Sequence, residues 1–142
     1  MKEILDMLKL HEGTGPMKGD RHMPYNDTEG YTTIGYGRNI EQIGISRDEA
    51  RSMLVTDLID AQYKCANEFG WYKELNEPRQ GVVTMMVFNL GLAGFKKFKK
   101  TIKHLSYGDY GLAADEMLRS RWADQVGDRA KLLSAMMQTG EW

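Results

Sequence analysis

The chain has 142 residues, of which 42% are hydrophobic and 27% charged, and its formal net charge is −1. This length suits one domain or two small lobes, and such a chain buries roughly two thirds of its unfolded surface without needing a disulfide or a metal. The near-neutral charge excludes a global basic field that would recruit nucleic acid or an anionic membrane. The single cysteine, Cys65, excludes a disulfide-stapled scaffold, and its helix-like surroundings predict a buried, inert thiol.

The N-terminal segment alternates apolar and charged residues. Ile4, Leu5 and Leu8 recur at helical spacing, which predicts an amphipathic helix over residues 2–11 that ends before Gly13. The segment has neither the continuous apolar core of a signal peptide nor the length of a membrane span. We therefore expect the protein to be made in a cytoplasm and to stay there unless something else releases it.

Residues 13–26 are rich in glycine, proline and charge and are predicted to form a loop. The β-branched and aromatic residues from Tyr31 to Arg38 indicate a strand, in which Gly35 and Gly37 mark a twist or a close backbone approach. A short hairpin partner is expected near residues 39–45.

Ser46 and Glu49 have the spacing of a helix capping box. The helical period that follows continues to about Ala66, which corresponds to a helix of roughly 30 Å. Residues 78–90 are apolar nearly all round and predict a central buried helix. Shorter helices are expected at about 95–105, 109–119 and 128–138.

These patterns predict an α+β, two-lobed fold. A small β-containing lobe would comprise residues 13–45. An interlobe helix over about 46–66 would join it to a larger helical lobe made of residues 1–12 plus 67–142.

Glu12, Asp27 and Thr33 are the residues whose positions suggest chemistry. The macrodipole of the first helix, together with any burial, would favour the protonated form of Glu12, whereas Asp27 on a polar turn among backbone N–H groups would stay ionised. Two carboxyl groups held in different protonation states are typical of enzymes that cleave glycosidic bonds. The spacing alone leaves other interpretations open: an Asx-turn residue for Asp27, a solvated helix end for Glu12 and ordinary strand propensity for Thr33.

Six segments, in order along most of the chain, resemble the phage lysozymes of the T-even type, the muramidases of glycoside hydrolase family 24. The most specific of them is DTEGYTTIGYGRN, which follows a helix that ends in Glu-Gly. The segments are ILDMLKLHEG (4–13), DTEGYTTIGYGRN (27–39), GISRDEARSMLVTDL (44–58), MVFNLGLAGF (86–95), SRWADQVGDRAKLL (120–133) and TGEW (139–142).

The resemblance implies roles for the three candidate residues. Glu12 would be the general acid that protonates the leaving oxygen, Asp27 would activate or support the attacking water, and Thr33 would position that water. The family inverts the anomeric carbon, so the two carboxyl groups should lie about 6.5–9.5 Å apart. Glu29 is expected to be a turn residue, and the resemblance implies neither a metal nor an organic cofactor.

The resemblance also implies supporting residues in the helical lobe. Arg129 would pair with Glu12, the alternative being an exposed arginine at a helix N-terminus. Phe88 and Asn89 fall where the family's cleft-facing helix touches substrate, although Phe88 is an equally good candidate for the core.

Two features depart from the family pattern. Where the family often has a histidine after GYG, this chain has Arg38, and we expect Arg38 to form a salt bridge with Asp57 on the interlobe helix. The segment from Asn39 to Ile45 is shorter, and the loop from Gly13 to Asn26 longer, than in the T-even lysozymes, so contacts with the sugar chain there should differ.

Other polar and aromatic features have plainer interpretations. The spacing of His11, Asp20 and His22 fits no zinc pattern. Trp122 is expected in the core. A basic cluster in the second half either forms a solvated helix face or attracts the anionic cell envelope; it comprises Lys96, Lys97, Lys99, Lys100, Lys103 and His104.

The resemblance implies an endolysin that hydrolyses the β-1,4 link between N-acetylmuramic acid and N-acetylglucosamine in peptidoglycan, as a monomer and without nucleic acid. It would act in host-cell lysis and reach the wall from the host cytoplasm with the help of a holin-type permeabilising partner. The alternatives are a lytic transglycosylase, against which Asp27 and Thr33 argue, a non-catalytic cell-wall-binding module, and a tail-associated lysozyme domain.

Overall fold

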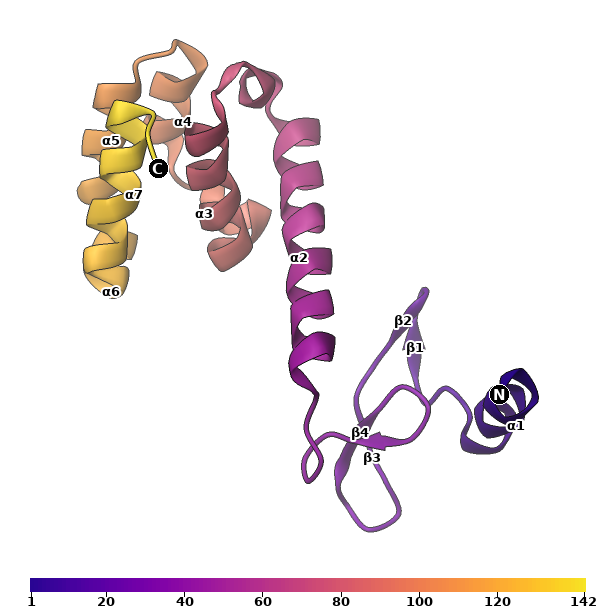
Figure 1. Cartoon of the computed structure of the whole chain (residues 1–142). Helices are drawn as coiled ribbons and strands as arrows, with labels where there is room; N and C mark the ends of the chain where they lie inside the picture. Colours follow the sequence, from indigo (N-terminus) through magenta and orange to yellow (C-terminus); the bar gives the residue numbers. More distant parts are fainter. The chain divides into compact units, whose positions relative to one another are not determined.

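The computed structural model describes all 142 residues, which divide into two compact units, Met1–Ser52 and Met53–Trp142. Figure 1 gives the order of the elements along the chain. Strands occur only in the first unit, while the second is made of helices. Helix α2 (Arg47–Glu68) crosses the division between them. The predicted α+β fold, with a small β-containing region followed by a helical one, is confirmed.

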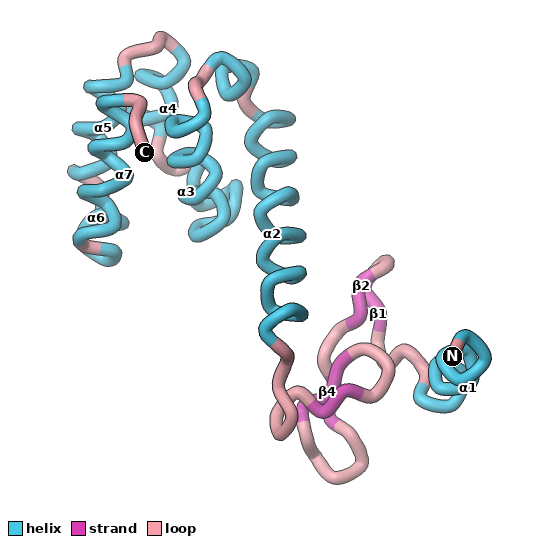
Figure 2. The backbone as a smooth tube through the Cα atoms, viewed as in Figure 1, coloured by secondary structure: helices cyan, strands magenta, loops and turns pink.

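The first unit consists of one helix and two small antiparallel sheets (Figure 2). Helix α1 spans Lys2–Glu12, as the hydrophobic spacing predicted. Strands β1 (Met17–Lys18) and β2 (Arg21–His22) form a hairpin, and a three-stranded sheet has the order β3 (Tyr25–Asn26), β4 (Thr32–Ile34), β5 (Arg38–Asn39).

The prediction that residues 13–26 form a loop was wrong, because three of the strands lie there. Each has only two residues, too few for the apolar–polar alternation that reveals a strand in a sequence. The hairpin is closed by a hydrogen bond from the backbone N–H of Met23 to the carbonyl oxygen of Pro16. The predicted hairpin partner of β4 exists, but it begins at Arg38.

Thr33 lies at the centre of the three-stranded sheet. It pairs with Tyr25 on β3 and with Asn39 on β5, and only 2% of it is exposed. No other residue among the first 52 is buried. This unit is therefore held together by hydrogen bonds and turns more than by an apolar core.

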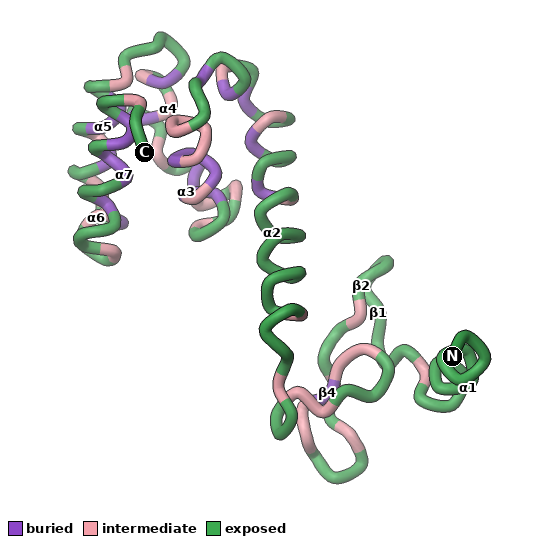
Figure 3. Tube along the Cα trace, in the orientation of Figure 1, coloured by how far each residue is buried: buried purple, intermediate pink, exposed green.

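Helix α1 carries exposed apolar side chains along its whole length, which Figure 3 shows as an unburied helix. They are Ile4, Leu5, Met7, Leu8 and Leu10. The prediction that residues 1–12 join the helical lobe stays a prediction.

The second unit contains the predicted helices and two elements that the sequence did not reveal. Helix α3 (Glu77–Phe95), helix α4 (Lys99–Ser106), helix α5 (Tyr110–Leu118) and helix α7 (Asp128–Thr139) match the expected segments. The 3₁₀ helix η1 (Gly70–Glu74) and helix α6 (Arg121–Val126) were not expected. None of the helices combines the length and apolarity needed to cross a bilayer.

The core of the second unit forms where α3, α5 and α7 pack with the C-terminal half of α2 (Figure 3). Cys65 is fully buried in it, as predicted, and burial raises the pKa of its thiol to about 11. Nearby, the hydroxyl groups of Tyr72 and Thr84 share a hydrogen bond of 2.8 Å. Trp122 also belongs to this core, which confirms its predicted packing role.

The end of α7 is held by Arg79 on α3. Its Nε donates to the carbonyl oxygen of Met137 at 2.8 Å and its Nη2 to that of Gln138 at 2.9 Å. The guanidinium lies over the ring of Tyr110, 4.1 Å from the ring centroid. A positive charge on unpaired carbonyl groups at a helix C-terminus is favourable, so the last turn is anchored to the core.

The start of α2 has the predicted capping box. The backbone N–H of Glu49 donates to Ser46 Oγ at 3.1 Å, and the backbone N–H of Ser46 donates to Glu49 Oε2 at 2.7 Å. The capping box thereby pairs the backbone N–H groups of Ser46 and Glu49 at the start of the helix.

Arg38 pairs with Glu49, and the expected salt bridge with Asp57 was wrong. Its Nη1 and Nη2 donate to the two carboxylate oxygens of Glu49 at 3.1 and 2.9 Å, and Nη1 also donates to the carbonyl oxygen of Gly44. The capping box orients the Glu49 carboxylate, and the planar guanidinium of Arg38 binds both of its oxygens in bidentate fashion.

This pair predicts an acid-sensitive contribution to stability. The hydrogen bond from Arg38 is the main cause that lowers the pKa of Glu49 from 4.5 to about 2. Because the pKa is lowered by folding, the stabilisation is complete above about pH 4.5 and is lost as the pH falls to about 2. We expect the difference in unfolding free energy between the wild type and Glu49→Gln, measured by urea titration, to be constant from pH 7 to 5 and to shrink between pH 4.5 and 2. A difference that does not change with pH would contradict the ion pair.

Candidate active site

The carboxylate of Glu12 lies directly against the backbone of Gly37. A Cβ atom at position 37 would be 2.6 Å from Glu12 Oε2 and 3.2 Å from its Cδ, closer than real Cβ atoms approach. Gly37 has φ +81°, which a side chain would also disfavour. The sequence predicted a twist or a close backbone approach at Gly35 and Gly37, and at Gly37 the group that approaches the backbone is the Glu12 carboxylate.

Glu12 is the last residue of α1, and Gly13 follows it with a hydrogen bond from its backbone N–H to the carbonyl oxygen of Lys9. The helix therefore stops at the residue whose side chain meets the β4–β5 turn. Glu12 is exposed in this structure.

Asp27 is fixed at the turn that joins β3 to β4. Its Oδ1 accepts hydrogen bonds from the backbone N–H groups of Glu29 and Tyr31, both at 2.9 Å. This is the Asx-turn geometry that the sequence left open as the plain interpretation. Oδ2 accepts no hydrogen bond from the protein, so one carboxylate oxygen orients the residue while the other stays available. Glu29 lies in the same turn, as predicted.

Thr33 donates its hydroxyl hydrogen to the carbonyl oxygen of Tyr31 at 2.9 Å. Because a hydroxyl oxygen also has two lone pairs, it keeps its capacity to accept a hydrogen bond. Asp27 and Thr33 thus both bond to Tyr31, one to its N–H and the other to its carbonyl group.

Tyr36 joins three segments around the Glu12–Gly37 contact. The ammonium of Lys9 on α1 lies 5.8 Å from its ring centroid. The ring of His22 on β2 meets it edge-on, with centroids 5.0 Å apart. His22 Nδ1 lies 3.1 Å from the carbonyl oxygen of Thr14, so the β1–β2 hairpin is held near α1 and the β4–β5 turn.

The remaining candidate residues lie in the second unit. Phe88 is 43% exposed, so the alternative that it belongs to the core was wrong. It lines a cavity of about 230 Å³ together with Asp57 and Lys64. Asn89 is exposed, and its Oδ1 accepts a hydrogen bond of 3.2 Å from Trp122 Nε1.

Arg129 lies in the first turn of α7 and is exposed. Its predicted pairing with Glu12 would link the two units and stays a prediction.

In the first unit, a carboxyl group at a helix end lies against the turn after β4, a second carboxylate lies in the turn before β4, and a threonine lies on β4 between these turns. No cluster of three or more His, Cys, Asp or Glu side chains has an arrangement that could hold a metal ion. Sequence reasoning missed the part played by Gly37 and Tyr36. The signal was the paired glycines of GYG, but which group approaches them depends on how the chain folds.

Comparisons with known proteins show the family to which the chain belongs. The family model described as "Phage lysozyme" matches residues 15–137. "Probable T4-type lysozyme 1" and "Probable T4-type lysozyme 2" of Dictyostelium discoideum are 28% and 27% identical to this chain, over 99% of it and 96% of each relative. "Pre-baseplate central spike protein Gp5" of Enterobacteria phage T4 is 28% identical over 96% of this chain and 28% of its own length.

The family model covers far more than half of the chain, and the matched relatives align with it from end to end. The chain therefore belongs to the phage lysozyme family, and it is a lysozyme, a glycoside hydrolase that acts on peptidoglycan.

Proposed function

We propose that this lysozyme hydrolyses the β-1,4 bond between N-acetylmuramic acid and N-acetylglucosamine with inversion, using Glu12 as the general acid and Asp27 as the group that activates water. The observation that supports this most strongly is the placement of the two carboxyl groups. Asp27 is fixed in the turn before β4, and Glu12 is held against Gly37 in the turn after it. The two carboxyl groups are thus associated with the two turns that flank the three-residue strand β4, and an inverting pair needs a separation of about 6.5–9.5 Å between them for the intervening water.

Thr33 is proposed to position that water. It lies on β4 itself, between the two turns, and its hydroxyl oxygen can accept a hydrogen bond from the water while donating to Tyr31. Asp27 would take the water's proton as the oxygen attacks the anomeric carbon, while Glu12 gives its proton to the leaving sugar oxygen.

Substrate contacts are proposed for Phe88 and Asn89 of the second unit, with Arg129 orienting Glu12. Phe88 offers an exposed ring beside a cavity, and the Asn89 amide keeps its N–H donors free because Trp122 uses its oxygen. An aromatic face and an amide donor are suited to an N-acetylated sugar.

The assignment predicts the effect of removing each carboxyl group. Glu12→Gln removes the proton donor and Asp27→Ala the base, and each should lower the clearing rate of a suspension of outer-membrane-stripped bacteria by at least about 10²-fold. The control is Glu29→Gln, which changes a carboxyl group in the same turn and should retain the wild-type rate. Full clearing by both site variants would overturn the assignment.

Released muropeptides, analysed by mass spectrometry, test the same proposal against a transglycosylase. Hydrolysis adds one water to each cut, so reducing ends should appear and anhydro ends should not.

The contact between Gly37 and Glu12 predicts that a side chain at position 37 lowers kcat. Gly35→Ala and Gly37→Ala both put a side chain at positive φ, +68° and +81°, and both should cost about 1 kcal/mol of stability. A Cβ at position 35 would touch nothing within 4 Å, whereas at position 37 it would displace the Glu12 carboxylate. We therefore expect kcat to fall by about tenfold or more in Gly37→Ala alone. Equal kcat losses in the two variants would show that backbone strain, not displacement of Glu12, is responsible.

We further propose that the protein acts as an endolysin from the host cytoplasm, as a monomer, after a holin-type partner has opened the membrane. Bacteria that express the chain should then keep growing, and they should lyse when the inner membrane is permeabilised with chloroform. Cells that express Glu12→Gln should survive as turbid suspensions. Lysis by the wild type before permeabilisation would contradict the need for such a partner.

A further inference from the structure

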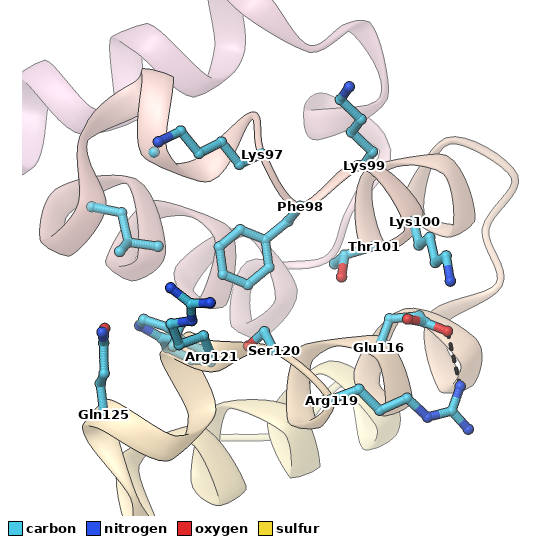
Figure 4. Close-up of a pocket in the computed structure, with 13 residues that line it drawn as sticks. Lys97, Phe98, Lys99, Lys100, Thr101, Glu116, Arg119, Ser120, Arg121 and Gln125 are labelled. Carbon is cyan, nitrogen blue, oxygen red and sulfur yellow. Dashed lines mark hydrogen bonds and ion pairs between the residues drawn. The ribbon is translucent and has the colours of Figure 1, made fainter.

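A pocket in the second unit lies between the start of α4 and the α5–α6 corner (Figure 4). It has a volume of about 650 Å³, and Phe98, Leu90 and Trp122 supply its apolar lining. Five basic residues and one acid also line it, although the whole chain has a net charge of −1. The basic residues are Lys97, Lys99, Lys100, Arg119 and Arg121, and the acid is Glu116.

Most of this positive charge is uncompensated. Glu116 forms an ion pair with Arg119, in which Nη1 of the arginine lies 3.0 Å from Oε1 of the glutamate. The other four cations form no ion pair, in contrast to Lys96 of the same basic cluster, which lies outside the pocket and pairs with Glu68 at 2.7 Å. From the sequence, this basic cluster was interpreted either as a solvated helix face or as a surface that attracts the anionic cell envelope. In the structure, three of its lysines line one pocket: Lys97, Lys99 and Lys100.

The start of helix α4, which lines this pocket, also has unpaired backbone N–H groups. Helix α4 has eight residues, and its N-cap, Phe98, provides no side-chain hydrogen bond. The first backbone hydrogen bond of the helix comes from Ile102 to the carbonyl oxygen of Phe98, so the N–H groups of Lys99, Lys100 and Thr101 have no partner. Free N–H groups and the positive end of the macrodipole favour an anion at such a terminus.

Thr101 provides the independent sign of a ligand. Only 2% of the residue is exposed, it lines the pocket, and its hydroxyl makes no hydrogen bond within the protein. Figure 4 shows this hydroxyl pointing into the space between Phe98, Ser120 and Glu116. No buried side-chain nitrogen or oxygen in the structure lacks a hydrogen-bond partner, so the Thr101 hydroxyl oxygen is itself open to the pocket and free to donate to a ligand there.

We propose that this pocket binds a phosphate ester carried on a sugar. The N–H groups of α4 and the Thr101 hydroxyl would donate to the phosphate oxygens, and Lys100 and Arg121 would balance the charge. The ring of Phe98 would pack against the sugar. Tetrahedral phosphate can accept from all of these donors at once, which a carboxylate with two oxygens cannot do as fully.

The test uses the full chain and amide NMR titrations with N-acetylglucosamine 1-phosphate. The amide signals of Lys99, Lys100 and Thr101 should shift and saturate. N-Acetylglucosamine should cause no saturable shift, and inorganic phosphate and acetate should each bind more weakly than the sugar phosphate. Binding of free phosphate as tight as that of the sugar phosphate would overturn the sugar part of the proposal, and acetate binding as tightly would overturn the phosphate part.

Three variants separate a built site from general attraction. Thr101→Val and Arg121→Ala should each raise the Kd by about five- to tenfold, the usual effect of losing one hydrogen bond. Lys103→Ala removes the same charge from α4 outside the pocket and should change the Kd less than twofold. An equal loss in Lys103→Ala, or no saturable shift with the sugar phosphate, would overturn the site. Glu12→Gln should bind the probe as the wild type does, which keeps this result independent of the proposed catalytic roles.

Discussion

The contact between the Glu12 carboxylate and the backbone of Gly37 is the constraint on which the candidate active site depends. It joins the end of a helix to a turn of the three-stranded sheet, two elements that are separated by the whole β1–β2 hairpin. A Cβ atom at position 37 would lie 2.6 Å from Glu12 Oε2, so any residue with a side chain there would force the carboxylate to move. The same turn carries Tyr36, whose ring contacts Lys9 and His22, so the segments around Glu12 are tied together on more than one side.

The two units hold their functional groups in different ways. The second unit has a packed core in which a buried thiol and a Tyr–Thr hydrogen bond lie among apolar side chains. The first has a single buried residue, Thr33, and its shape comes from hydrogen bonds at turns and from the Arg38–Glu49 pair. Side chains in the first unit are therefore oriented by polar contacts. Substitutions there should alter the geometry of the site more readily than the packing of a core.

The elements that could be predicted from the sequence are those with a local signal. The capping box at Ser46, the helical period of α1 and the burial of Cys65 each follow from neighbouring residues. The two-residue strands carry no such signal. The partner of Arg38 was misjudged because a salt bridge depends on which acid the fold brings near, and the capping box had already fixed Glu49 there. The neighbour of Gly37 could not be predicted for the same reason: its distance from Glu12 in the sequence fixes no distance in space.

The central claim is that a water molecule attacks from between Glu12 and Asp27. The configuration of the first product tests it most directly, because the separation of the two carboxyl groups decides between inversion and retention. Proton NMR of the anomeric signals, recorded in the first minutes of hydrolysis and before mutarotation, reports that configuration. The account predicts that the new reducing end appears as the α-anomer and converts slowly to the equilibrium mixture. Initial appearance of the β-anomer would mean that the water does not attack in this way.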